Sequence, residues 1–168
     1  MSWGVPDEMV IKDNVPFMAE KEYRYIKDLI DKNNFKTALE WGAGSSTIWF
    51  PKNTVIKSWL AIEHNDKYVN YLKDKVSDKV ELRLLSDKDD YINVKGKFDF
   101  ILIDGLYRDE CLDQSFSLIN KNGKIILHDA GRKAYKEWYS KYDYRTVFEG
   151  EGWLSDGWDH RGLAEFSL

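Results

Sequence analysis

The sequence predicts one α/β domain: a doubly wound, mostly parallel sheet of seven strands with helices on both faces and a C-terminal antiparallel hairpin. Strand-like and helix-like segments alternate along most of the chain, which implies right-handed crossovers between parallel strands. The run KFDFILID at 97–104 is nearly uniformly apolar, as expected for a strand that is covered on both faces. Two final strand-like runs, 144–149 and 163–168, are joined by a glycine-rich link too short for a crossover helix, so they predict the hairpin.

The spacing of apolar residues defines the elements in the first half of the chain. Ile26, Leu29 and Ile30 share one helical face, and two asparagines end that helix. A later helix can be capped by Asn65 or Asp66. The predicted elements are, in order, helix 18–33, strand 36–41, helix 45–50, strand 58–63, helix 65–76, strand 80–85 and strand 97–104. We expect the last of these strands at the centre of the sheet.

The second half continues the alternation up to the hairpin. The predicted elements are helix 109–120, a turn at 121–123, strand 123–129, helix 131–142 and the two hairpin strands. No repeat, low-complexity segment or linker divides the sequence, so we expect residues 1–168 to form one domain. Within it, residues 1–17 are an N-terminal extension that we expect near the substrate crevice.

Composition narrows the class of protein. The chain is 43% hydrophobic, which is ample for one buried core, and its net charge of −4 comes from interspersed charges without a long basic block. We therefore expect a small-molecule substrate and neither nucleic acid nor membrane as a partner. No export signal or run of 18 apolar residues is visible, and the single Cys111 fits a reducing, cytoplasmic setting as a buried thiol. The oligomeric state stays open.

A glycine loop is the first functional feature. In LEWGAGSST, Gly42 and Gly44 follow a predicted strand, where glycine permits a turn and a close approach of the backbone to a ligand. Glu63 ends the next strand nineteen positions after Gly44, where a carboxylate can accept hydrogen bonds from both hydroxyls of an adenosine ribose. Thr47 stands where a nicotinamide dinucleotide site needs its third glycine, and no Walker lysine follows the loop.

These motifs resemble those of the class I S-adenosylmethionine-dependent methyltransferases over about residues 18–168. The resemblance rests on EWGAGSST, Glu63, the Asp104-Gly105 pair after the fourth strand, and the closing hairpin. It implies that the glycine loop wraps the methionine part of the cofactor, that Glu63 holds the ribose, and that residues 86–87 border the adenine. The implied cofactor-binding residues are Glu40, Gly42, Ala43, Gly44, Ser45, Ser46, Glu63, His64, Ser86, Asp87, Asp104 and Gly105.

The candidate catalytic residues are Asp104, His128 and Asp129, which follow or end two neighbouring strands. Asp104 and Asp129 could hold Mg²⁺, as in metal-dependent O-methyltransferases of the catechol type, although Ala130 stands where that family has an asparagine ligand. Without a metal, His128 or Asp129 could take the substrate proton. Alternatively, His128 is only a strand-end histidine bonded to Asp104, and Asp129 only a helix cap.

Residues near the same strand ends could bind the acceptor. Arg108, Arg132 and Lys133 could hold a carboxylate or phosphate, unless they are solvated surface charges. The sequence LHDAGR also resembles the H-D-x-x-R of plant glucuronoxylan methyltransferases. The candidate substrate-binding residues are Tyr107, Arg108, Arg132, Trp153 and Trp158, the two tryptophans either stacking on a ring or packing on the sheet edge.

The sequence thus favours a methyltransferase that uses S-adenosylmethionine and acts on an oxygen of a small sugar-like or phenolic acceptor, which could be anionic. Mg²⁺ is an open second cofactor. Two alternatives belong to other classes: a catalytically silent module that binds adenosine or a glycan, and a nucleotide-linked oxidoreductase.

Overall fold

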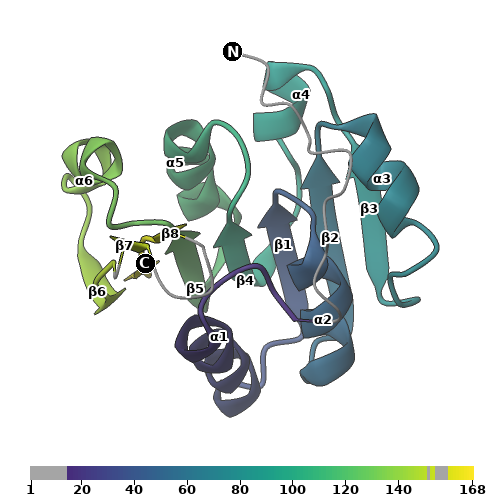
Figure 1. Cartoon of the computed structure of the whole chain (residues 1–168), viewed down its shortest axis with the longest axis horizontal. Helices are drawn as coiled ribbons and strands as arrows, with labels where there is room; N and C mark the ends of the chain where they lie inside the picture. Colours follow the sequence, from purple (N-terminus) through teal and green to yellow (C-terminus); the bar gives the residue numbers. More distant parts are fainter. Residues whose placement is uncertain (1–14, 151, 154–158) are drawn as a thin grey trace.

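The computed structural model describes residues 15–150, 152–153 and 159–168 (Figure 1). The strands are β1 (Thr37–Trp41), β2 (Ser58–Glu63), β3 (Val80–Leu84), β4 (Phe98–Ile103), β5 (Ile119–His128), β6 (Tyr144–Phe148), β7 (Gly152–Trp153), β8 (Asp159–His160) and β9 (Leu163–Phe166). The helices are α1 (Glu20–Lys32), α2 (Ser45–Asn53), α3 (Asp66–Leu72), α4 (Lys88–Ile92), α5 (Arg108–Leu118) and α6 (Lys133–Tyr139). No helix in these ranges is long and apolar enough to cross a membrane.

Seven of the strands form one sheet in the order β3-β2-β1-β4-β5-β9-β6. The first five pair in parallel, whereas β9 lies antiparallel between β5 and β6. The strands β7 and β8 form a separate two-stranded ribbon. The doubly wound sheet, the central place of β4 and the C-terminal antiparallel hairpin are all confirmed.

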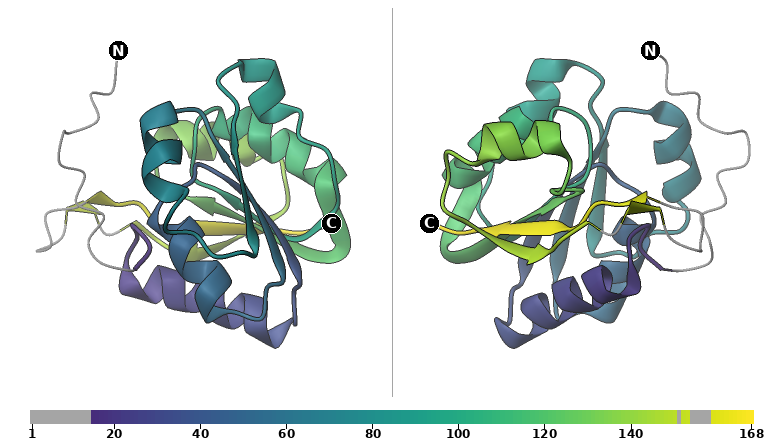
Figure 2. Two further views of the ribbon diagram at one scale, coloured as in Figure 1. Left: turned by 90° about the vertical axis from the view of Figure 1, so that its right-hand side faces the viewer. Right: turned by 60° about the vertical axis from the view of Figure 1, so that its left-hand side comes forward.

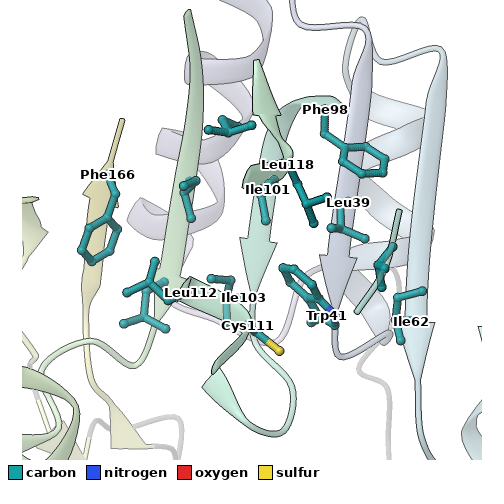
Figure 3. Packing of buried hydrophobic residues seen from close by; sticks show 14 of the residues in the cluster. Leu39, Trp41, Ile62, Phe98, Ile101, Ile103, Cys111, Leu112, Leu118 and Phe166 are labelled. Carbon is teal, nitrogen blue, oxygen red and sulfur yellow. The ribbon is translucent and has the colours of Figure 1, made fainter. Parts of the chain in front are cut away.

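Helices cover both faces of the sheet, because successive strand residues point to opposite sides. Figure 2 shows α1 and α2 on one side and α5 and α6 on the other. Ala38 and Phe100 pack with Ile26 and Ile30 of α1, whereas Leu39 belongs to a second core. That second core includes Trp41, Ile103, Cys111 and Phe166 (Figure 3), so the thiol is buried as predicted.

Two helices depart from the predicted pattern. The side chain of Asn65 caps α3 as expected, but that helix ends at Leu72 and not at Val76. The helix α4 was not predicted, because its five residues bury only Tyr91 and show no apolar period; it begins at a cap, where Asp87 accepts the N–H groups of two following residues.

The predicted turn at 121–123 is wrong. These residues continue β5, and they form an irregularity opposite Asp99: Ile119 pairs with Phe98, and regular pairing resumes at Lys124 with Phe100. Glycine is required inside this irregularity, since a Cβ on Gly123 would lie 2.7 Å from the Asp99 carbonyl oxygen. The KNG residues at 121–123 therefore lie in a bulged strand and not in a chain reversal.

The neighbouring strands β1 and β4 form the topological switch point, because the helices after them lie on opposite faces of the sheet. Their two following loops touch there. Gly42 has a φ of +93°, and a Cβ on it would lie 2.6 Å from the Cα of Gly105. The switch point places the glycine loop beside the loop that begins with Asp104.

Candidate functional site at the carboxyl ends of the strands

The two glycines of the β1 loop differ in their surroundings. Gly42 is packed against the backbone at Asp104 and Gly105, so its close approach is to another loop of the chain. Gly44 has an extended φ of −169°, and a Cβ on it would meet no atom within 4 Å. Open space, which a ligand could fill, therefore lies at Gly44 and not at Gly42.

Glu40 lies beneath this loop and is fully buried. Its carboxylate accepts hydrogen bonds from the Ser46 hydroxyl, from the Thr47 hydroxyl at 2.7 Å and from the Trp59 indole N–H at 2.8 Å. Burial raises the pKa of Glu40 to about 7, although these bonds oppose the shift. The Thr47 hydroxyl also accepts the N–H of Gly44 at 2.9 Å, so Glu40 and Thr47 together hold the loop in shape.

Glu63 ends β2 with a side chain that is only 6% exposed. Its Oε1 accepts the backbone N–H groups of His64 and Asn65, each at 2.9 Å, and the His64 ring lies at the same distance from it. Burial raises the pKa of this carboxyl group. The carboxylate also accepts a backbone hydrogen bond from Ala43 of the β1 loop, so the backbone of two loops orients Glu63.

The next two predicted residues line the start of α4. The Ser86 hydroxyl donates to the His64 carbonyl at 3.3 Å, which joins the β3 loop to the β2 loop. Asp87 is exposed, and its carboxylate accepts the N–H groups of Asp89 at 2.9 Å and Asp90 at 3.1 Å. Asp87 is thus the N-cap of α4, a role that the sequence did not reveal.

Sequence reasoning also missed Tyr91, which supports the loop after β4. Its hydroxyl accepts the N–H of Leu106 at 3.2 Å, and its ring lies edge-to-face with Tyr107 at 5.8 Å and with His64 at 6.4 Å. Tyr107 is 37% exposed and takes a left-handed φ of +49°, which is uncommon for an aromatic residue. His64, Tyr91 and Tyr107 therefore form an aromatic row, with the buried Tyr91 in the middle. No periodic pattern in the sequence indicates this row.

The three candidate catalytic residues come together at the ends of β4 and β5. Atoms of Asp104, His128 and Asp129 that could bind a metal all lie within 4.8 Å of one another. His128 Nδ1 is 2.8 Å from Asp104 Oδ1. Asp129 has a φ of +58°, a strained conformation of the kind that concentrates at functional sites.

His128 is enclosed on both edges by carboxylates. Its Nε2 is buried and lies 3.4 Å from Glu22 Oε2, an ion-pair distance without a well-aligned hydrogen bond. Burial by itself lowers the pKa of His128, but the charge of Asp104, the hydrogen bond to it and the nearby Glu22 raise it to about 10. His128 is therefore an imidazolium at neutral pH, and Glu22 is a member of the cluster that sequence reasoning missed.

The Arg108 side chain links the loop after β4 to the loop after β5. Its Nε donates to the Gly105 carbonyl at 2.9 Å, and one terminal nitrogen faces the His128 carbonyl at 2.8 Å and Asp129 Oδ2 at 3.3 Å. The other terminal nitrogen faces the carbonyl and Oδ1 of Asp104, both at 3.1 Å. Four of these contacts are hydrogen bonds and the fifth is an ion pair, so the guanidinium is engaged mainly with the loops of the chain.

Arg132 is the accessible arginine of the site. Its side chain is 45% exposed, and one terminal nitrogen lies 2.7 Å from Asp129 Oδ2. The Tyr135 ring, another residue that the sequence did not single out, has the guanidinium carbons of Arg108 and Arg132 each 5.5 Å from its centre. This arrangement leaves Arg132 with donors to offer a ligand.

The acidic residues do not fit a Mg²⁺ site as they lie. Mg²⁺ requires near-octahedral oxygen coordination. Asp104 Oδ1 is already paired with His128 and Arg108, and Asp129 Oδ2 with Arg108 and Arg132. His128, the third residue of this cluster, is itself bonded through Nδ1 to Asp104. The carboxylates form an ion-pair cluster with three cations, which compete with a metal for the same oxygens.

The residues do fit S-adenosylmethionine. Open space at Gly44 adjoins the turn into α2, and Glu63 offers a buried, oriented carboxylate at the end of the adjacent strand. A glycine without a neighbour for its Cβ and a carboxylate in this position suit the methionine and ribose parts of the cofactor. Of the predicted substrate residues, Trp158 and the side chain of Trp153 lie outside the described part of the chain, as do residues 1–14.

Comparison of the sequence with protein-family models and with curated proteins found no match. The structure is similar to solved methyltransferases. A Staphylococcus aureus protein described as a caffeoyl-CoA O-methyltransferase has a TM-score of 0.70 and 22% identity, and the match covers 90% of this chain and 84% of that one. The methyltransferase PaMTH1 of Podospora anserina, solved with bound SAH, has a TM-score of 0.68 and 16% identity over 93% of this chain and 80% of that one.

The likeness extends to a methyltransferase that acts on RNA. A tRNA methyltransferase from M. jannaschii has a TM-score of 0.59 and 19% identity, and the match covers 88% of this chain and 48% of that one. This chain has the fold of the class I S-adenosylmethionine-dependent methyltransferases.

Proposed function

We propose that this chain is a methyltransferase that binds S-adenosylmethionine and methylates an oxygen of a small sugar-like or phenolic acceptor, which can carry negative charge. The observation that carries the proposal is the juxtaposition at the switch point: the open space at Gly44, the oriented carboxylate of Glu63 and the Asp104 cluster lie at neighbouring strand ends. In a doubly wound sheet, ligands bind at this edge.

The cofactor-binding residues have distinct proposed tasks. Glu63 would accept hydrogen bonds from the ribose hydroxyls, and the backbone around Gly44 would contact the methionine part. Glu40 would act indirectly, because its carboxylate is buried and already bonded to three donors of the chain. His64, Ser86 and Asp87 would border the adenine, with the aromatic row behind them.

Asp104 is our candidate proton acceptor. S-adenosylmethionine, when bound, would supply a methyl group activated by its positively charged sulfur, which the acceptor oxygen would take as its proton passes to the chain. The Asp104 side chain is 20% exposed, compared with 8% for His128 and 10% for Asp129. Its Oδ1 is held by His128 and Arg108, so its carboxylate is oriented to accept the proton of the acceptor's hydroxyl group. His128, as an imidazolium, would orient Asp104 and not act as the base.

We propose that the reaction proceeds without Mg²⁺, because one oxygen of each carboxylate is already paired: Asp104 Oδ1 with His128 and Arg108, and Asp129 Oδ2 with Arg108 and Arg132. Arg132 is the residue we assign to an anionic group of the acceptor, since its guanidinium is the accessible one. Arg108, by contrast, would position the loops.

The first prediction tests cofactor binding. Glu63→Ala should weaken the binding of SAH by about 1.5–3 kcal/mol, the range for hydrogen bonds to a charged group, which is roughly 10- to 150-fold in Kd. Isothermal titration calorimetry checks this, with Glu81→Ala as the control, because Glu81 is exposed on the neighbouring strand β3 and pairs only locally with Arg83. Equal affinity of wild type and Glu63→Ala, with unchanged circular dichroism, contradicts the ribose assignment.

The protein prepared for calorimetry can also be assayed for methyl transfer. Labelled S-adenosylmethionine should give methylated product with one of catechol, protocatechuate or glucuronic acid, and EDTA should leave the rate unchanged. Bulk tRNA is included because one structural neighbour acts on tRNA, and NADH serves as the ligand for the oxidoreductase alternative. Product with tRNA alone would overturn the small-molecule acceptor, and EDTA-sensitive transfer would overturn the metal-free reaction. Binding of NADH in place of SAH would overturn the methyltransferase assignment.

A further inference from the structure

Glu22 is a buried carboxylate in the first turn of α1. Its residue is 1% exposed, and Glu22, Ile26 and Ile30 are the buried residues of this helix. A charge within an apolar stripe costs free energy unless it is balanced by a counter-charge or by hydrogen bonds. One compensation is local: Oε2 accepts the N–H of Ala19 at 2.9 Å, as in the back-bond of a capping box.

The second compensation comes from the other side of the site. Oε2 of Glu22 lies 3.4 Å from Nε2 of His128, at the carboxyl end of β5. The opposite ring nitrogen, Nδ1, lies 2.8 Å from Asp104 Oδ1. An ionised carboxylate only accepts hydrogen bonds, so both ring nitrogens face acceptors and the ring is held from two sides.

Helix capping alone does not explain why the Glu22 carboxylate is buried and faces His128. A capping glutamate normally reaches back along a solvated helix end, whereas Glu22 is enclosed and directed at the histidine that contacts the proposed proton acceptor. If Glu22 were absent, Nε2 of His128 would be buried without a counter-charge, and the ring would be held only through Asp104. The orientation of Asp104 would then depend on a histidine that is free to turn.

We propose that Glu22 is a positioning residue for methyl transfer: it holds the His128 ring in the orientation in which Nδ1 donates to Asp104. It acts through His128 and does not touch the acceptor or the cofactor. The inference rests on the proposed function, because the orientation of Asp104 matters for the rate only if Asp104 receives the acceptor's proton.

The experiment compares Glu22→Gln with Glu20→Gln. Glutamine keeps the side-chain length and can still accept the Ala19 N–H, so helix capping is preserved while the charge facing His128 is removed. Glu20 is the matched control, since it lies in the same helical turn but is exposed and paired with Arg24 at 2.6 Å. With whichever of catechol, protocatechuate and glucuronic acid the wild type methylates, kcat should fall at least tenfold in Glu22→Gln, with KM and the Kd for SAH within twofold. Glu20→Gln should match wild type.

A double-mutant cycle with His128→Gln identifies the route of the effect. The loss of kcat caused by Glu22→Gln should disappear in the His128→Gln background, because the residue through which Glu22 acts is then absent. An equal loss in both backgrounds overturns the inference, and so does an unchanged kcat in Glu22→Gln. Circular dichroism verifies that all variants are folded.

A spectroscopic signature separates this inference from the proposed function. In ¹⁵N-labelled protein, the Nε2–H of His128 should give a protected signal that is absent in His128→Gln and lost or shifted in Glu22→Gln but not in Glu20→Gln. An identical signal in wild type and Glu22→Gln overturns the inference whether or not methyl transfer is observed. If the protein binds no SAH and methylates no acceptor, the proposed function fails, and the positioning role fails with it.

Discussion

Gly42 and Gly44 illustrate at the scale of single residues how one loop can combine two different constraints. At Gly42 the positive φ and the backbone of the neighbouring loop exclude a side chain, so glycine is required for folding. At Gly44 neither constraint applies, because its φ is extended and the space around it is open. The sequence pattern predicts that the backbone at both glycines approaches a ligand. At Gly42, however, a side chain would collide with Gly105 and would not fill ligand space.

This difference gives a prediction. Gly44→Leu should lower the affinity for SAH at least tenfold while costing only about 1 kcal/mol of unfolding free energy, the typical cost of a poor residue at the N-cap of a helix. Gly42→Ala should instead destabilise the fold by more than about 1 kcal/mol, because alanine is strained at a positive φ. Urea unfolding and calorimetry measure the two effects. Wild-type affinity in Gly44→Leu would remove the glycine loop from the cofactor site.

At the scale of elements, α4 is a short helix whose start borders the proposed adenine position. It has five residues, and only Tyr91 is buried, so its local stability depends strongly on its cap. Tyr91 in turn holds the loop after β4 through Leu106 and lies beside Tyr107. The cap at Asp87 is therefore connected, through a single aromatic residue, to the loop that follows Asp104.

We predict that Asp87→Ala destabilises the protein by about 0.5–2 kcal/mol, the usual cost of losing an N-cap acceptor. Asp87→Asn should lose much less, because asparagine keeps an acceptor oxygen in the same place. Urea unfolding measures the difference, and hydrogen exchange should show faster opening at the amides of residues 89–92 in Asp87→Ala alone. Equal stability of all three proteins would contradict the capping role.

At the scale of the whole molecule, the buried ionisable groups make stability depend on pH. The pKa of His128 is raised to about 10 from an ordinary value near 6.5, so the folded protein binds this proton more tightly than the unfolded chain does. The resulting stabilisation is fully present below pH 6.5 and is lost as the pH rises through 10. Each unit of pKa difference corresponds to about 1.4 kcal/mol.

The prediction compares wild type with His128→Gln by urea unfolding at a series of pH values. The variant should be less stable than wild type at pH 6, and the difference should shrink steadily as the pH rises from about 6.5 towards 10. Glu40→Gln should alter the pH dependence between about pH 4.5 and 7, since the pKa of Glu40 is raised from 4.5 to about 7 and the stabilisation by its proton is fully present below pH 4.5 and lost as the pH rises through 7. A difference between wild type and His128→Gln that is independent of pH would contradict a protonated His128.

Apolar spacing, caps and glycines act over a few residues, so the order and type of most elements follow from the sequence. The sequence also located Gly44, Glu63, Asp104, His128 and Asp129 at the carboxyl ends of strands, since parallel strands place those ends at one edge. It could not reveal α4, which lacks an apolar period, or the bulge at 121–123, where polar residues continue a strand because Ile119 still pairs with Phe98.

The pairing of charges in the site, by contrast, depends on contacts between elements that are distant in the sequence. The sequence predicts Arg108 as a substrate-binding residue, and the structure adds that its guanidinium makes four hydrogen bonds and an ion pair with residues after β4 and β5. Glu22 stands far from His128 in the sequence, and no local pattern indicates that α1 packs with its first turn against the end of β5. The pKa of a side chain depends on burial and on neighbours in space, so the charge state of His128 was fixed only when the fold placed two carboxylates around it.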